Sequence, residues 1–148
     1  MTTQKSKLQT AARLILGLVF TVFGLNGFIH FLPQPEQVGQ AAVFLGGLGA
    51  SGYMFPLIKG TEVVAGVLLL AGRYVPLALT VLAPVVLNIV LFHAFLDPKA
   101  IALPVVLLGL GLYLAWTERS SYAPLFKARS AAPAPGRRSS GGHAQAAA

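Results

Sequence analysis

The amino-acid sequence predicts an all-α membrane protein, a bundle of four transmembrane helices with both termini in the cytoplasm. Of its 148 residues, 55% are hydrophobic and only 10% are charged, a composition that soluble domains of this length do not show. Four long apolar stretches fill residues 14–116, and most of the basic residues flank them. We therefore expect one membrane domain over residues 1–126.

The first span is expected at residues 14–32. A bilayer core takes about 20 helical residues, and this run is longer than the roughly 7–15 apolar residues of a secretory signal. It ends in Leu32-Pro33-Gln34-Pro35, without a small-residue cleavage site. We interpret it as a retained transmembrane helix.

A short interfacial helix is predicted in the outer loop, residues 33–53. The segment Pro35-Glu36-Gln37 is typical of a helix start. Apolar residues then recur at helical spacing, namely Val38, Ala41, Ala42, Leu45 and Leu48. The glycine-rich run 46–52 is expected to break this helix, which would lie on the outer membrane surface.

Three further spans are expected at residues 54–71, 75–96 and 101–116. The first two of these are separated only by a tight turn at residues 72–74. Pro84 lies inside the third of the four spans, so we expect a kink there and a carbonyl one turn earlier that lacks its backbone donor.

The positions of the basic residues predict the orientation. With both termini and the 72–74 turn in the cytoplasm, nine of the eleven Lys and Arg residues lie inside, as the positive-inside rule requires. The net charge of +7 therefore indicates contact with the bilayer rather than with nucleic acid. Residues 127–148, rich in Ala, Pro, Gly and Ser, are expected to form a disordered basic tail.

Six polar residues of the first three spans form a candidate pocket in the outer half of the bundle. At about 1.5 Å per residue from the cytoplasmic end, they lie between roughly 16 and 27 Å along their helices. A central charge costs roughly 2.5–3.5 kcal/mol on insertion scales, so such residues mark places to look for function. The set is Asn26, His30, Lys59, Glu62, Asn88 and His93.

Local spacing relates some of these residues to one another. Lys59 and Glu62 are three residues apart and can pair directly, while Asn26 and His30 are four apart and share a helix face. Asn88 and His93, five apart, are separated by about 140° around an ideal helix. Structural interpretations stay open for all six: an ion pair that only stabilises, amides that join helices, and half-solvated interfacial histidines.

Three stretches resemble the DoxX family of small four-helix bacterial membrane proteins. They are residues 17–33 (GLVFTVFGLNGFIHFLP), 52–79 (GYMFPLIKGTEVVAGVLLLAGRYVPLAL) and 83–98 (APVVLNIVLFHAFLDP). The family is named after a subunit associated with thiosulfate:quinone oxidoreductase. The resemblance therefore implies a multi-pass protein of the bacterial cell (inner) membrane and association with a membrane oxidoreductase complex. It implies no catalytic residue set.

Three functions are compatible with these observations. The favoured one is an accessory or quinone-interacting subunit of a membrane redox system, in which His30 and His93, each flanked by Phe, donate to quinone carbonyls and Glu62 carries the coupled proton. The second is a small-solute or proton-coupled carrier gated by the Lys59 and Glu62 pair. The third is a non-catalytic membrane scaffold.

Cofactor predictions are limited to quinone. A haem ligated by both histidines is an alternative that we do not favour. The sequence contains no cysteine, which excludes a catalytic thiol, thiolate metal ligation and covalent haem attachment. No metal site is predicted.

Overall fold

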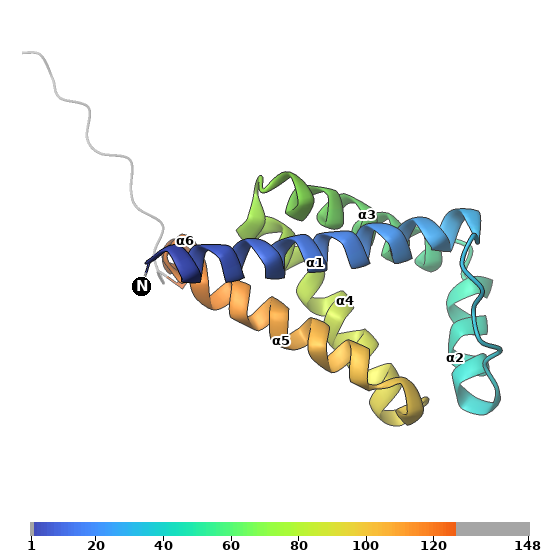
Figure 1. Ribbon diagram of the computed structural model, residues 1–148. Coiled ribbons are helices and arrows are strands. Elements are labelled where there is room, and N and C mark those ends of the chain that lie inside the picture. Colours follow the sequence, from blue (N-terminus) through green and yellow to red (C-terminus); the bar gives the residue numbers. More distant parts are fainter. Residues whose placement is uncertain (1, 127–148) are drawn as a thin grey trace, which may run out of the picture.

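The computed structural model describes residues 2–126, and its regular elements there are all helical (Figure 1). This confirms the all-α prediction; the tail predicted for residues 127–148 lies outside the described residues. In chain order the elements are α1 (Thr2–Ile29), α2 (Gly39–Ala50), α3 (Met54–Ala71), α4 (Val75–Phe95), the 3₁₀ turn η1 (Pro98–Ala100), α5 (Ala102–Thr117), α6 (Arg119–Tyr122) and the 3₁₀ turn η2 (Ala123–Phe126).

Three of these helices are long and apolar enough to cross a membrane. They are α1 over Ser6–Ile29, α3 and α4, whereas α2 and α5 are shorter apolar helices. Large apolar side chains on the outside of the bundle agree with this property: Val64, Leu87 and Val106 are 62%, 53% and 56% exposed. Apolar surface of this kind is typical of contact with lipid.

The helix bounds reflect residues with special backbone conformations. Helix α3 has the predicted bounds, because Gly72 follows it with φ of 67° and ends it in the left-handed conformation that glycine adopts readily. Helix α1 ends at Ile29, before the predicted end of the first span, because His30 has φ of 48°. It also begins at Thr2, well before the apolar run, since the polar residues that precede the run continue the same helix.

Helix α2 confirms that the outer loop is helical, but its bounds differ from those expected. It begins at Gly39, whose φ is 61°, rather than at residues 35–37, because Val38 before it is extended, with φ of −125° and ψ of 161°. The predicted break at residues 46–52 was largely wrong, since the helix continues to Ala50. A helical glycine costs about 1 kcal/mol, less than backbone groups left unpaired in an apolar environment.

The break falls instead at the end of the glycine-rich run, where Ser51 closes a turn. Its hydroxyl donates to the Leu48 carbonyl oxygen at 2.6 Å and accepts from the Met54 backbone N–H at 3.0 Å. Along α2, Ala41 is buried and Leu45 is half-buried. The helical stripe predicted for this segment therefore contains the buried residue of α2, while Val38 at its start is exposed.

Helices α1 and α3 form the most extensive contact in the described part of the chain, and α4 and α5 complete the bundle (Figure 1). One end, here named the terminal end, carries the start of α1, the 72–74 turn and α6. There Gln9 Nε2 donates to Glu118 Oε1 at 3.0 Å, and the Tyr122 hydroxyl donates to the Pro76 carbonyl oxygen at 2.9 Å. The opposite end, named the loop end, carries the end of α1, α2 and η1.

Candidate functional site

Glycines allow α1 and α3 to approach each other closely. A Cβ on Gly17 would lie 2.9 Å from the Leu70 backbone nitrogen, and a Cβ on Gly66 would lie 2.6 Å from the Thr21 backbone nitrogen. No real Cβ tolerates such distances to backbone, so only glycine fits at either position. The contact is thus the small-residue type by which membrane helices pack.

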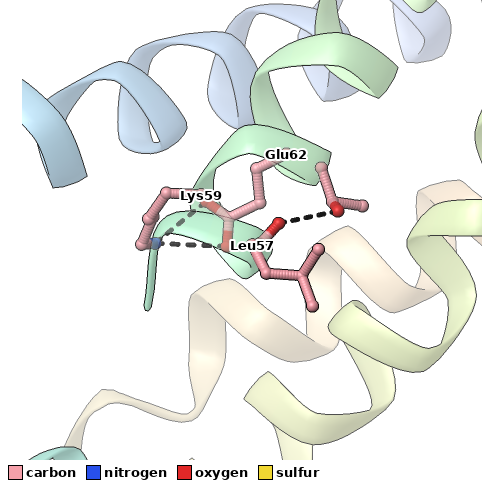
Figure 2. Close-up of polar contacts among 4 residues, drawn as sticks. Leu57, Lys59 and Glu62 are labelled. Atoms are coloured by element: carbon pink, nitrogen blue, oxygen red, sulfur yellow. Dashed lines mark hydrogen bonds and ion pairs between the residues drawn. The ribbon is translucent and has the colours of Figure 1, made fainter. Parts of the chain in front are cut away.

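Toward the loop end of this contact, Lys59 and Glu62 form an ion pair on α3 (Figure 2). The ammonium nitrogen of Lys59 lies 2.9 Å from Glu62 Oε2 and 3.1 Å from Oε1. The Glu62 side chain is 2% exposed and that of Lys59 is 22% exposed. The pairing predicted from the three-residue spacing is confirmed.

Helix α1 covers this pair with two glycines. A Cβ on Gly27 would overlap the aliphatic stem of Lys59, and a Cβ on Gly24 would lie 3.1 Å from the Cβ of Glu62. Among the side chains of residues 6–125, no buried nitrogen or oxygen lacks a hydrogen-bond partner. The pair is therefore satisfied internally and enclosed by the α1–α3 contact.

Asn26 is buried one residue before Gly27 and acts on the end of its own helix. Its Oδ1 accepts a hydrogen bond from the Leu32 backbone N–H at 2.6 Å, and its carbonyl accepts from the His30 backbone N–H at 3.0 Å. The side chain is 2% exposed. Asn26 thus fixes the turn in which His30 adopts its positive φ, a role that needs no ligand.

The other three candidates are not enclosed with the pair. His30 and Asn88 are exposed, and His93 is half-buried. His93 Nδ1 lies 2.9 Å from the Ile89 carbonyl oxygen; because a carbonyl only accepts, Nδ1 must carry the hydrogen. The structure therefore joins Lys59 to Glu62, uses Asn26 for the turn after its own helix, and leaves Asn88 and both histidines in separate surroundings.

An aromatic group at the loop end includes His93, Phe92 and Phe44. Its ring meets the ring of Phe92 edge-on with centroids 5.1 Å apart, and the ring of Phe44 on α2 lies 5.7 Å from that of Phe92. Helix α2 is thereby positioned against the end of α4.

Sequence reasoning missed Arg13. Its guanidinium donates to the Leu69 carbonyl oxygen and, at 3.0 Å, to that of Leu70. These are carbonyls of the last turn of α3, where a cation stabilises the helix C-terminus; the Leu69 carbonyl oxygen also accepts from the Gly72 backbone N–H at 3.1 Å. The sequence did contain a signal for this contact. Arg13 lies at the predicted cytoplasmic end of the first span, level with the turn at Gly72 that follows the second span.

Two apolar crevices are lined by other parts of the bundle. The larger, about 700 Å³, lies between α1, α4 and α5 at the terminal end and is named the terminal crevice; Phe20, Leu82 and Leu107 contribute to its wall. The smaller, about 420 Å³, lies between α3 and α4. None of the six predicted site residues lines either crevice.

Metal ligation and known relatives add no further assignment. Among the residues that the structure describes, no group of three or more His, Asp or Glu side chains is placed to hold a metal ion. Comparison of the chain with protein-family models, curated proteins and solved structures found no match. The function must therefore be argued from the geometry and from the residues themselves.

Proposed function

We propose that this chain is a four-span membrane protein of DoxX type in the bacterial inner membrane, where it serves as an accessory scaffold subunit of a membrane redox complex. The observation that carries the scaffold role is the enclosed pair of Lys59 and Glu62. Its charges satisfy each other inside the α1–α3 contact, which suits a rigid structural element better than a site that exchanges ligands. The redox partner rests on the resemblance of residues 17–33, 52–79 and 83–98.

The packing of α5 supports a fourth span. Its 16 residues extend about 24 Å, and the three residues of η1 add about 6 Å, which together match a hydrocarbon core about 30 Å thick. Helix α5 also contacts both α1 and α4. A helix that contacts two candidate spanning helices is expected to share their environment.

The charges at the two ends support the proposed orientation. Arg13, Arg73 and Arg119 belong to the terminal end, whereas Lys99 of η1 and the neighbouring Asp97 belong to the loop end. The positive-inside rule then puts the terminal end, with the start of α1 and with α6, in the cytoplasm. Helix α2 accordingly lies at the outer surface.

A second candidate function, contact with quinol at the loop end, is favoured by the aromatic group around His93. Because His93 Nδ1 donates to Ile89, the Nε2 atom of the neutral ring is an acceptor. An acceptor on a ring that meets Phe92, which in turn meets Phe44, suits a quinol hydroxyl, whereas a quinone carbonyl needs a donor. In this arrangement the subunit binds the reduced carrier rather than the oxidised one.

Purification of the tagged full-length chain from native membranes in mild detergent tests the scaffold role. We expect it to retain subunits with a redox cofactor, seen in a reduced-minus-oxidised optical spectrum and identified by mass spectrometry. The double variant Lys59→Met/Glu62→Met should retain the same subunits, because a purely structural pair can be replaced by apolar side chains of similar volume.

The possible outcomes separate the hypotheses. If the wild-type chain retains no cofactor-bearing subunit, the redox role is wrong. If the double variant is folded but loses activity of the complex, the pair acts chemically, as the carrier hypothesis requires. For quinol, His93→Phe should lower the quinone and quinol content of the lipid extract without releasing the partner subunits, with His30→Phe as the matched control.

A further inference from the structure

The terminal crevice is an apolar space with one cationic side chain at its end. Leu82 of α4 and Leu107 of α5 belong to its wall, and Trp116, Arg119 and Tyr122 lie at its terminal end. Its volume of about 700 Å³ falls within the range of roughly 300–1,000 Å³ for ligand sites. In a bilayer such a space between helices is filled by hydrocarbon.

The length of the crevice matches one leaflet. Its lining follows α5 from Leu107 to Trp116, a rise of about 14 Å. Half of a hydrocarbon core about 30 Å thick is about 15 Å. A spanning helix of a second copy would need a groove along the whole bundle, so the half-length crevice favours an acyl chain from the leaflet at the terminal end.

The terminal end of the crevice is suited to an anionic head group. The Arg119 guanidinium lies 5.4 Å from the centroid of the Trp116 ring and donates to the Trp116 carbonyl oxygen at 3.2 Å. The adjacent acidic residue, Glu118, accepts a hydrogen bond from Gln9. Arg119 is exposed, so its remaining N–H groups can bind a phosphate, for which guanidinium geometry is well matched.

Side chains of α4 and α6 hold the base of the crevice together. The Pro76 carbonyl oxygen accepts hydrogen bonds from the Tyr122 hydroxyl at 2.9 Å and from the Thr80 hydroxyl at 2.8 Å. This contact joins α6 to the start of α4 and keeps Arg119 at the end of the crevice. Basic pockets between helices on the cytoplasmic side are a known arrangement for anionic lipid head groups.

We propose that the terminal crevice binds an anionic phospholipid, with one acyl chain between α4 and α5 and the phosphate at Arg119. The proposal rests on the chain spanning a bilayer, as argued under the proposed function, and not on the identity of any partner protein.

The sole tryptophan of the sequence, Trp116, provides the probe. The full-length protein is reconstituted into phosphatidylcholine vesicles that contain equal mole fractions of either phosphatidylglycerol or phosphatidylcholine with brominated acyl chains, which quench tryptophan on contact. We expect the relative association constant to favour the anionic lipid by about five-fold, which corresponds to about 1 kcal/mol for one arginine near the head group.

Two pairs of variants assign the preference to the crevice. Arg119→Gln should bring the anionic preference close to one, whereas Arg73→Gln, at the exposed 72–74 turn of the same end, should leave it unchanged. Gly111→Leu should lower quenching by both lipids, because its side chain enters the crevice. Gly109→Leu is the control, since neither glycine has a heavy atom within 4 Å of an added Cβ and Gly109 is not in the crevice lining.

Each result has a definite consequence. Equal quenching of wild-type Trp116 by both lipids would overturn the anionic site while leaving the bilayer location intact. If Arg73→Gln lowers the preference for anionic lipid as much as Arg119→Gln does, the preference comes from general attraction to the basic surface. That result would also overturn the anionic site. Absence of quenching by either brominated lipid would instead contradict the membrane proposal itself. Strong quenching that only Gly111→Leu and Arg119→Gln reduce would support the site.

Discussion

Replacing the buried ion pair one residue at a time, and then as a pair, tests whether it stabilises the α1–α3 contact. Lys59→Met leaves the Glu62 carboxylate, 2% exposed, without its counter-charge, and breaking a buried pair costs about 3–5 kcal/mol. Glu62→Met should cost less, about 1–3 kcal/mol. The difference arises because the Lys59 side chain is 22% exposed and its long stem can carry the ammonium toward the surface.

The double variant should be more stable than either single variant. With methionine at both positions no charge remains, and the stem of residue 59 still packs against Gly27, so we expect a loss of about 1 kcal/mol or less. The sum of the two single-variant losses in unfolding free energy would then exceed the loss of the double variant by at least about 3 kcal/mol, which is a large coupling energy.

Equilibrium unfolding in mixed micelles, titrated with dodecyl sulfate and followed by helical circular dichroism, measures all three variants. Val64→Met serves as the control, since Val64 lies on the same helix and is 62% exposed. Losses that add to within about 0.5 kcal/mol would show that the two side chains act independently. That result would refute the assigned role, whatever the distance between the charged atoms.

Three further predictions concern packing, titration and topology. Gly66→Ala should lower the free energy of unfolding by about 1–3 kcal/mol, because the added Cβ would meet the Thr21 backbone. Gly60→Ala is the control and should be neutral or slightly stabilising, since the space around its Cβ is open. Equal losses for the two variants in the same titration would contradict the close contact. Burial raises the pKa of the Tyr122 hydroxyl above 10.0, so the folded protein keeps this proton to higher pH than the unfolded chain, and stability should fall as pH rises above 10. Tyr122→Phe should make the melting temperature less dependent on pH in that range, and an unchanged slope would argue against the assignment. A reporter active only in the cytoplasm, fused after Ala148, should be active, and an inactive but folded reporter would reverse the orientation.

Helix bounds were predictable wherever a local feature ends the helix. Gly72 is such a feature, and the end of α3 agrees with the prediction at that point. The beginning of α1 was not predictable from hydropathy, because residues 2–13 are polar yet helical. Apolar content shows where a helix can enter a bilayer, but it does not show how far the helix extends beyond it.

The candidate site was predictable only where its contacts are local in sequence. Lys59 and Glu62 pair because residues three apart on a helix are neighbours. Asn88 was grouped with them because of its expected depth in the membrane. The depth of a residue along its helix does not define the side of the helix on which the residue lies, and Asn88 is exposed. The terminal crevice left no pattern in the sequence at all, since its apolar lining uses the same residue types as a well-packed core.

The location of both pair members on one helix has a consequence for membrane insertion. Each charge alone would add roughly 2.5–3.5 kcal/mol to the cost of inserting α3, but an intrahelical pair is complete as soon as one turn of that helix forms. Helix α3 can therefore enter the lipid with its charges already neutralised, independently of α1. Arg13 differs, because the carbonyls that it binds belong to α3 and are synthesised more than fifty residues later. The contact of Arg13 with α3 can therefore form only after α3 has been synthesised, whereas the pair on α3 does not depend on α1.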